Sequence, residues 1–255
     1  MKIKIVAAKE FPGIKRLQEE FDVGKTGEIC IAVGGDGTFV RAAREYDGPI
    51  LLIRSNEPGS SGYYSDVSLD DIENVIDKLK KHKYRIETLE KKLHISYSGK
   101  SYYAVNEAVL RNMQREVNFK VYEDNKGKLD DIYPFVMGGD GVLITSSIGS
   151  TAYNKSAGGP IILSPSVFCL TFLNADGPYR NPIVVGAVKK IVVKVVKYPG
   201  VLEYDGMKIA TVTPGKSFSV KLSDRDLRIV KLEGREEKMS DKLERVIRSR
   251  MIKDL

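Results

Sequence analysis

A buried strand that leads directly into a glycine-rich turn and a helix constrains the fold of this 255-residue chain more than any other feature. Residues 28–33 are predicted to form a strand in which every residue after Glu28 is apolar, and such a run is typical of a strand covered on both faces in a parallel sheet. A Gly-Gly-Asp-Gly-Thr segment follows, and the next apolar residues recur at helical spacing. Comparable strand and helix patterns lie, in chain order, at residues 2–7, 11–21, 50–53 and 68–81. This alternation predicts an N-terminal α/β domain with a mostly parallel sheet.

The pattern changes near residue 84, where short alternating strands and tight turns replace the helices. We therefore predict a β-rich, β-sandwich-like domain over residues 84–234, after an α/β domain over residues 1–83. A last amphipathic stretch, about residues 240–252, predicts a C-terminal helix. We expect this helix, within residues 235–255, to pack back on the first domain.

Composition excludes several classes of protein. Two cysteines, Cys30 and Cys169, cannot build a disulfide framework, and two histidines without a Cys-x-x-Cys pair do not supply the usual zinc ligands. No apolar run approaches the ~18 residues that a membrane helix needs, and the N-terminus lacks the apolar core of a signal peptide. We expect a cytoplasmic protein with no membrane partner.

The formal net charge of +7 favours anionic partners. The basic residues are mixed with acidic ones, however, and no basic-aromatic recognition motif stands out. We therefore expect small anionic ligands and no nucleic acid.

The glycine-rich turn at residues 34–38 is the first candidate for chemistry. Glycines allow a ligand to approach the backbone, and the N-terminus of the following helix favours phosphate. A carboxylate at Asp36 repels phosphate, so it makes chemical sense if it accepts a proton from a hydroxyl or holds Mg²⁺. The alternative is a simple tight turn in which Asp36 caps the helix. The sequence lacks the complete P-loop and dinucleotide-binding glycine patterns.

Two further segments carry polar groups in apolar surroundings. Asn106-Glu107 interrupts an apolar stretch, and an amide beside a carboxylate suits the vicinal hydroxyls of a ribose; the alternative is a strand end or turn. Residues 140–161 form a loop rich in hydroxyl groups and glycine that could enclose a purine or ribose. Its candidate polar groups are Ser150, Thr151, Tyr153, Asn154 and Ser156. The alternative here is a Ser/Gly-rich surface loop.

Together these segments resemble the NAD kinase family. The family's GGDGT stands at residues 34–38, its Asn-Glu pair at 106–107, and its long third motif at 140–160. Residues 180–184 and the Asp-Gly of residues 204–206 are similar to two later family segments. The chain departs from the family where Ser147-Ile148 replaces Pro-Thr, and where residues 56–64 replace Gly-x-x-Gly-Phe with an extra residue and tyrosine for phenylalanine.

The resemblance implies an α/β nucleotide-binding domain followed by a β-rich domain. It also implies phosphoryl transfer from ATP or polyphosphate to the 2′-hydroxyl of the adenosine ribose of NAD. Mg²⁺ or another divalent cation would enter with the donor, without dedicated protein ligands. Family members are homodimers or homotetramers. The alternatives are a diacylglycerol- or sphingosine-type lipid kinase, which shares GGDGT, and a non-catalytic nucleotide sensor.

The resemblance also assigns roles to residues of this sequence. Asp36 would orient the acceptor hydroxyl and take its proton. Gly35, Gly37 and Thr38 would hold the phosphates of the donor. Asn106 and Glu107 would bind ribose hydroxyls. The remaining contacts to NAD would come from Asp36, Gly37, Asp140, Thr151, Ala152, Tyr153 and Ser156.

Overall fold

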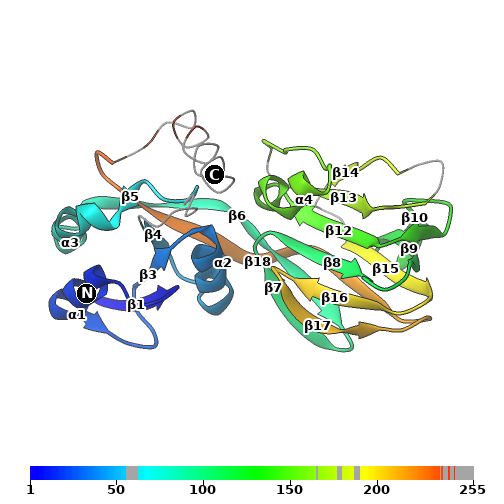
Figure 1. The fold of residues 1–255 in the computed structure, drawn as a ribbon, viewed down its shortest axis with the longest axis horizontal. Helices are drawn as coiled ribbons and strands as arrows, with labels where there is room; N and C mark the ends of the chain where they lie inside the picture. Colours follow the sequence, from blue (N-terminus) through cyan, green and yellow to red (C-terminus); the bar gives the residue numbers. More distant parts are fainter. Residues whose placement is uncertain are drawn as a thin grey trace. The chain divides into compact units, whose positions relative to one another are not determined.

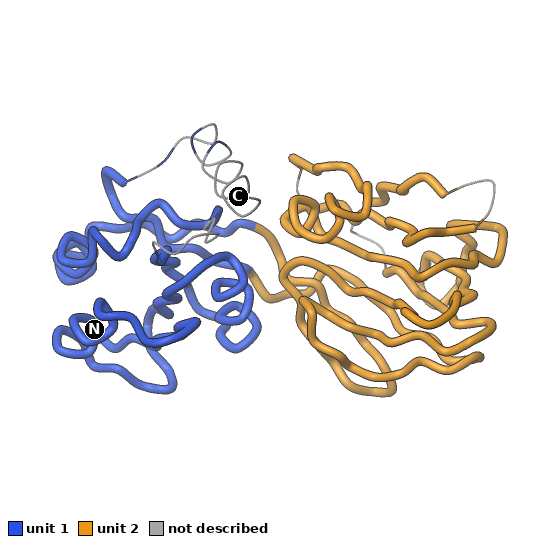
Figure 2. The backbone as a smooth tube through the Cα atoms, viewed as in Figure 1, with its two compact units in different colours: residues 1–89, 227–255 blue, residues 90–226 orange. Residues whose placement is uncertain are grey.

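The chain divides into two compact units in the computed structural model, which describes residues 1–55, 63–164, 166–176, 180–186, 190–235, 237, 241 and 244 (Figures 1 and 2). Unit 1 comprises Met1–Leu89 and Leu227–Leu255, and unit 2 comprises Glu90–Asp226. Strands β6 (Tyr84–Tyr97) and β18 (Ser217–Leu232) contribute residues to both units. The boundaries expected from the sequence are 83/84, where β6 begins, and 234/235, shortly after β18 ends. The observed division falls within these two strands, at 89/90 and 226/227.

Unit 1 is built around a parallel sheet in the order β2–β1–β3–β4. These strands are β1 (Lys2–Ala7), β2 (Asp22–Val23), β3 (Ile29–Gly34) and β4 (Ile50–Arg54). The short strand β5 (Val67–Ser68) and the last part of β18 both pair with β4 in parallel. Every residue of β3 is buried, as its continuous apolar sequence predicts.

The described residues of unit 1 form four helical segments, and all but the 3₁₀ turn bury apolar side chains. They are α1 (Pro12–Glu20), α2 (Asp36–Glu45), the 3₁₀ turn η1 (Leu69–Asp71) and α3 (Ile72–Lys80). The predicted helix at 68–81 is therefore divided into a 3₁₀ turn and an α-helix, and the hydroxyl of Ser68 makes no capping hydrogen bond. Side chains of α1, α3 and the sheet share one apolar core that includes Leu17, Ile31 and Leu79.

Unit 2 contains a six-stranded antiparallel sheet in the order β14–β13–β12–β8–β16–β17. Its strands are β8 (Glu107–Arg111), β12 (Gly141–Ser146), β13 (Val167–Leu173), β14 (Ile183–Gly186), β16 (Gly200–Tyr204) and β17 (Met207–Val212). The other strands of this unit include β7 (Lys100–Ala104), β9 (Val117–Asn125), β10 (Lys128–Asp131), β11 (Met137–Gly139) and β15 (Lys190–Lys197). Within this second group β9 pairs with β10, β11 and β15, β15 pairs with β18, and β6 pairs with β7.

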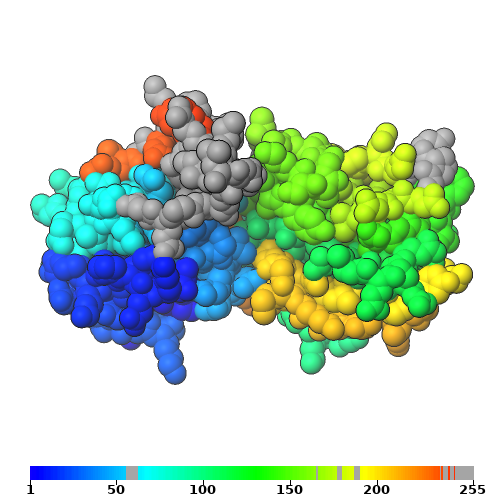
Figure 3. All heavy atoms as spheres, viewed as in Figure 1, coloured from blue at the N-terminus to red at the C-terminus, as the bar shows by residue number. Residues whose placement is uncertain are grey.

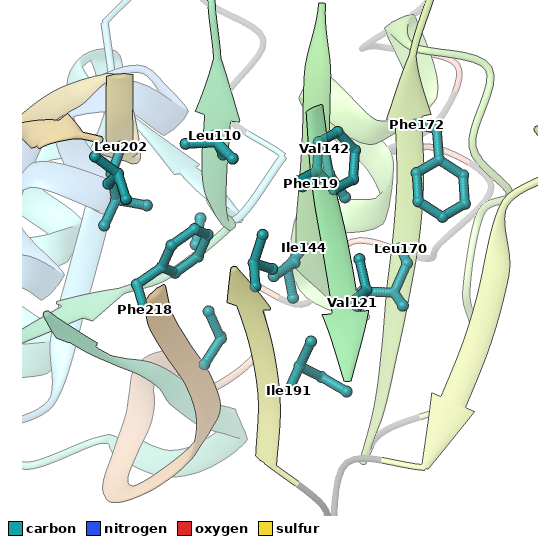
Figure 4. Packing of buried hydrophobic residues seen from close by; sticks show 14 of the residues in the cluster. Leu110, Phe119, Val121, Val142, Ile144, Leu170, Phe172, Ile191, Leu202 and Phe218 are labelled. Carbon is teal, nitrogen blue, oxygen red and sulfur yellow. The ribbon is translucent and has the colours of Figure 1, made fainter. Parts of the chain in front are cut away.

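Side chains from the two groups of strands meet in one apolar core. Figure 4 shows Val142 and Ile144 of β12 close to Phe119 and Val121 of β9. All four side chains are buried, because alternate residues on each strand point inward. The structure thus confirms the predicted fold class, an α/β unit with a parallel sheet and a β-sandwich-like unit.

Two short helical segments, η2 (Ile148–Thr151) and α4 (Tyr153–Ser156), follow β12 in unit 2. The predicted C-terminal helix lies almost entirely outside the described residues. No helix in the described part of the chain is long and apolar enough to cross a membrane.

Candidate active site

The glycine-rich turn of unit 1 joins β3 to α2. Gly34 has a φ of +148°, and a Cβ on it would collide with the hydroxyl of Thr38, so only glycine fits here. The amides of Thr38 and Phe39 donate to the carbonyl oxygen of Gly35 at 2.9 and 3.3 Å. Gly37 is exposed, with open space where a Cβ would stand. The first turn of α2 therefore presents its backbone to solvent at the positive end of the helix dipole, which suits a phosphate.

Asp36 is the first residue of α2 and is half-buried. Its Oδ1 accepts a hydrogen bond of 3.2 Å from the backbone amide of Tyr64, and the Tyr64 ring stacks on Phe39 with centroids 4.6 Å apart. The carboxylate is therefore held at the carboxyl edge of the sheet, where ligands bind in open α/β folds. Burial, and next the charge of Asp36, raises the pKa of the neighbouring Tyr63 hydroxyl. No local pattern in the sequence links Tyr63 and Tyr64 to Asp36.

The Asn106-Glu107 pair lies where β8 begins in unit 2. Asn106 does not adopt a left-handed conformation and lies directly before the first residue of β8, so its local structure is that of a strand end. Glu107 is 7% exposed, and its Oε2 is buried with no hydrogen-bond partner among the described residues. Burial, together with the charge of Asp205, raises the pKa of Glu107 to about 8. The pair thus presents a half-buried amide beside a buried carboxyl group whose pKa is raised by its surroundings.

Asp205 fixes the backbone of this pair. Its carboxylate accepts hydrogen bonds from the amides of Val105 and Asn106, both at 2.8 Å, and of Glu107 at 3.3 Å. Asp205 lies in the turn between β16 and β17, about 100 residues further along the chain. The Asp-Gly turn was recognised from its resemblance to a family segment, but no role followed for Asp205. Only the folded sheet brings this turn close to the Asn106-Glu107 pair.

The end of β12 and the hydroxyl-rich loop that follows it contact the same backbone. The hydroxyl of Thr145 and the amide of Ser146 donate to the carbonyl oxygen of Asn106 at 2.9 and 3.1 Å. A Cβ on Gly149 would collide with that same carbonyl group, so the loop can approach only with glycine there. The second and third sequence motifs are therefore one connected structure within unit 2.

The polar residues of the loop divide into two groups. Ser150 and Asn154 are fully buried and bind within the fold: Ser150 Oγ donates to Ser147 O at 2.6 Å, and Asn154 Nδ2 donates to Pro160 O at 2.8 Å. Asn154 Oδ1 also accepts from the Thr171 hydroxyl at 2.6 Å. These two side chains are thus engaged within the protein, contrary to the hypothesis that they face a ligand.

The other predicted residues of the loop are accessible. Tyr153 and Ser156 are exposed, Thr151 and Ala152 are half-buried, and Figure 3 shows the light-green segment around them at the surface of unit 2. Tyr153 and Ser156 line a hollow of about 380 Å³ together with Asp140, whose Oδ2 accepts from Asn174 Nδ2 at 2.6 Å. Arg111, which the sequence analysis did not single out, also lines it and forms an ion pair of 2.9 Å with Glu203.

A buried carboxylate on β6 anchors the start of this loop. Glu90 is 6% exposed, and its Oε2 accepts from the Ser147 hydroxyl at 2.6 Å and from the Ile148 amide at 3.3 Å. Its Oε1 accepts from the amide of Ser166 at 3.2 Å. Ser147 and Ile148, where the chain departs from the family pattern, are therefore both hydrogen-bonded to Glu90. This contact could not be predicted from the sequence.

The described part of the chain offers no preformed cluster of metal ligands. It contains no group of three or more His, Cys, Asp or Glu side chains placed to hold a metal ion. Asp36 is a single carboxylate at the sheet edge, so a divalent cation there would take most of its ligands from phosphate and water.

A glycine-rich turn with one carboxylate at a helix N-terminus in unit 1, and a carboxyl–amide pair and a polar hollow in unit 2, are compatible with a nucleotide-dependent kinase. Residues 105–232 match the model of the ATP-NAD kinase C-terminal domain. The chain is 30% identical over 212 residues to an NAD kinase of Sulfurimonas denitrificans, covering 80% of this chain and 72% of that protein. It is 29% identical to an NAD kinase of Thermoplasma acidophilum, covering 80% and 74%. The chain belongs to the NAD kinase family, and it is an enzyme of the kinase class.

Solved structures show the same fold. The crystal structure of an NAD kinase from Archaeoglobus fulgidus in complex with ATP superposes with a TM-score of 0.74 at 22% identity, covering 98% of this chain and 99% of that one. Yeast NADH kinase complexed with NADH superposes with a TM-score of 0.77 at 15% identity, covering 97% and 86%.

Proposed function

We propose that the protein is an NAD kinase that transfers a phosphoryl group from ATP or polyphosphate to the 2′-hydroxyl of the adenosine ribose of NAD; when ATP is the donor, this is its γ-phosphoryl group. The observation that carries this proposal is the position of Asp36, a carboxylate held by the Tyr64 amide at the first residue of a phosphate-binding helix. Membership of the family supplies the substrate class.

The chemistry follows from this carboxylate and the turn around it. The 2′-oxygen attacks the γ-phosphorus, the bond from that phosphorus to the bridging oxygen of ADP breaks, and Asp36 takes the proton of the hydroxyl. Gly35, Gly37 and Thr38 hold the donor phosphates at the start of α2. Mg²⁺ or another divalent cation, entering with the donor, would neutralise phosphate charge.

Unit 2 binds the acceptor nucleotide in this proposal. The protonated carboxyl of Glu107 can donate a hydrogen bond through its unpartnered oxygen, and Asn106 offers both a donor and an acceptor. Both groups suit ribose hydroxyls. Asp140, Tyr153 and Ser156, which line one hollow, would contact the rest of NAD together with Thr151 and Ala152.

The test is NADP formation by the purified protein with NAD and Mg²⁺, in parallel reactions with ATP and with polyphosphate, read by an NADP-specific dehydrogenase. We expect NADP with at least one donor and none from a matched Asp36→Asn preparation. Absence of NADP with both donors would refute the proposal, and phosphorylation of diacylglycerol in vesicles would favour the lipid-kinase alternative.

We further propose that the enzyme is a cytoplasmic homodimer or homotetramer. Large apolar side chains on the loop after α4 support an association surface, since Leu163 is 90% exposed. Sedimentation at micromolar concentration should give a species of at least twice the 28.4 kDa chain mass, and a monomer would refute the assembly.

A further inference from the structure

An arginine lies beside the glycine-rich turn in unit 1. Arg54 is the last residue of β4, and it stands opposite Gly34 in the parallel pairing of β3 with β4. A backbone hydrogen bond links the ends of β3 and β4 next to this pair, because the Ser55 amide donates to the carbonyl oxygen of Gly34 at 3.2 Å. Arg54 therefore lies at the same carboxyl edge of the sheet as Asp36.

The register also determines the face of the sheet on which Arg54 lies. Alternate residues of a strand share a face, so Arg54 shares one with Gly34 and with the Lys4–Cys30 pair of β1 and β3. The ammonium of Lys4 donates to the carbonyl oxygen of Glu45 in α2 at 3.3 Å, which identifies this as the face covered by α2. Because α2 begins at Asp36, Arg54 and the proposed base occupy one edge and one face of the sheet.

The guanidinium of Arg54 is incompletely paired. Its Nη2 lies 3.8 Å from Glu237 Oε1, beyond hydrogen-bond distance, and its Nε is buried without a partner among the described residues. A buried, unpaired donor is costly, so the site favours a further acceptor beyond those that the described residues supply. Lys231, the nearby cation of β18, is by contrast engaged by Asp66 in a buried ion pair.

We infer that Arg54 is a catalytic residue that binds the terminal phosphate of the donor and stabilises the charge on the phosphoryl group as it transfers. This inference rests on the proposed function. Its chemical reason is that the turn at residues 34–38 supplies amide dipoles and one carboxylate but no cation, whereas charge spreads over three phosphoryl oxygens during transfer. A guanidinium can donate two parallel hydrogen bonds to such oxygens.

Arg228 provides a matched control. Its Nε is also buried without a partner among the described residues, and its Nη2 donates to the carbonyl oxygen of Asp47 at 2.8 Å. Arg228 precedes Ile229, which pairs with Ile50 at the amino end of β4, the opposite end from Arg54. Arg54→Ala and Arg228→Ala thus remove the same kind of side chain from two neighbouring strands, one at the carboxyl end of β4 and one beside its amino end.

The experiment measures kcat, the KM for NAD and the KM for ATP in both variants, with thermal unfolding and a titration of a non-hydrolysable ATP analogue with Mg²⁺. We expect Arg54→Ala to lower kcat by about 10²–10³-fold and to weaken analogue binding, with the KM for NAD unchanged. Arg228→Ala should retain kcat within about threefold. Millimolar guanidinium should restore part of the activity of Arg54→Ala, an effect that a structural role would not produce.

Equal kcat in Arg54→Ala and Arg228→Ala would overturn the inference. If Arg54→Ala does not fold, Arg54→Lys takes its place. A kcat reduced by at least tenfold in this variant supports paired hydrogen bonds from the guanidinium to the phosphoryl oxygens. An unchanged kcat with unchanged analogue binding opposes them. Failure of the proposed function is distinguishable, because the wild type would then form no NADP, whereas the analogue titration still tests Arg54.

Discussion

Replacement of Asp205 by alanine should disable the Asn106-Glu107 pair without touching a substrate group directly. In the wild type one carboxylate accepts three backbone hydrogen bonds, from Val105, Asn106 and Glu107. The variant leaves these amides without that acceptor, and it removes the negative charge that helps to raise the pKa of Glu107. The start of β8 then loses the contact that fixes its backbone.

The expected loss in the free energy of unfolding follows from those three hydrogen bonds. Hydrogen bonds to a charged acceptor contribute about 1.5–3 kcal/mol each, but water can reach part of this half-buried turn and replace some of them. We therefore expect a loss of about 2–4 kcal/mol in the free energy of unfolding. For a chain of this size that corresponds to a fall in Tm of about 4–16 °C. Misplaced ribose contacts should weaken NAD binding by at least about tenfold.

The assay compares Asp205→Ala with Asp124→Ala by thermal unfolding and by titration with NAD and with ATP. Asp124 also caps a turn of unit 2, where its Oδ1 accepts from the Gly127 amide at 2.7 Å, but this turn lies between β9 and β10. Both variants should lose stability, and only Asp205→Ala should lose NAD affinity, with ATP affinity retained. Equal NAD affinity in the two variants would refute the assigned role of Asp205.

Two further predictions concern the acceptor side. Tyr153→Ala should weaken NAD binding by about 1–3 kcal/mol with little change in ATP affinity, because a ring contact and a hydrogen bond are lost; an unchanged NAD titration would remove Tyr153 from the site. The pKa of Glu107 is raised from 4.5 to about 8 in the folded protein. Between these two pH values the folded protein retains a proton that the unfolded chain releases. The free energy of unfolding therefore falls as the pH rises through this interval. Glu107→Gln stays neutral, so its Tm relative to the wild type should increase between pH 5 and pH 8, and a constant difference would contradict the raised pKa.

Local patterns were sufficient to predict the α/β unit. The continuous apolar run of β3, the glycine turn and the stripe of α2 are neighbours in the chain, so their periodicity predicts the strand, the turn and the helix directly. The hairpin of β6 and β7 is a similar case, because Ser98 and Gly99 take the positive φ values of a tight turn between them.

Long-range pairing could not be predicted in this way. Asp205 meets the Asn106-Glu107 pair across about 100 residues, and no local pattern of either segment indicates the other. Glu90 was not singled out in the sequence, and its burial and its hydrogen bonds to the loop after β12 depend on packing in three dimensions. Arg54 looked like the end of an apolar strand, and only the register of β4 places it beside Gly34.

The sequence also could not predict which polar side chains of the hydroxyl-rich loop are buried and which are accessible. Ser150 and Asn154 have the same chemistry as the accessible Thr151 and Ser156, and they differ in the direction that the turns of η2 and α4 give each side chain. Composition identified the loop as polar and tightly built, but the backbone decides which groups remain for a ligand.

The most direct test of the proposed mechanism is the turnover of Asp36→Asn beside its NAD affinity and its Tm. Asparagine preserves the size of the side chain and can still accept from the Tyr64 amide, but it cannot take the proton of the 2′-hydroxyl. If Asp36 is the base, kcat should fall by about 10²–10⁴-fold with NAD affinity and Tm near the wild-type values. Near-normal turnover would contradict the mechanism and leave residues 34–38 as a phosphate-binding turn only.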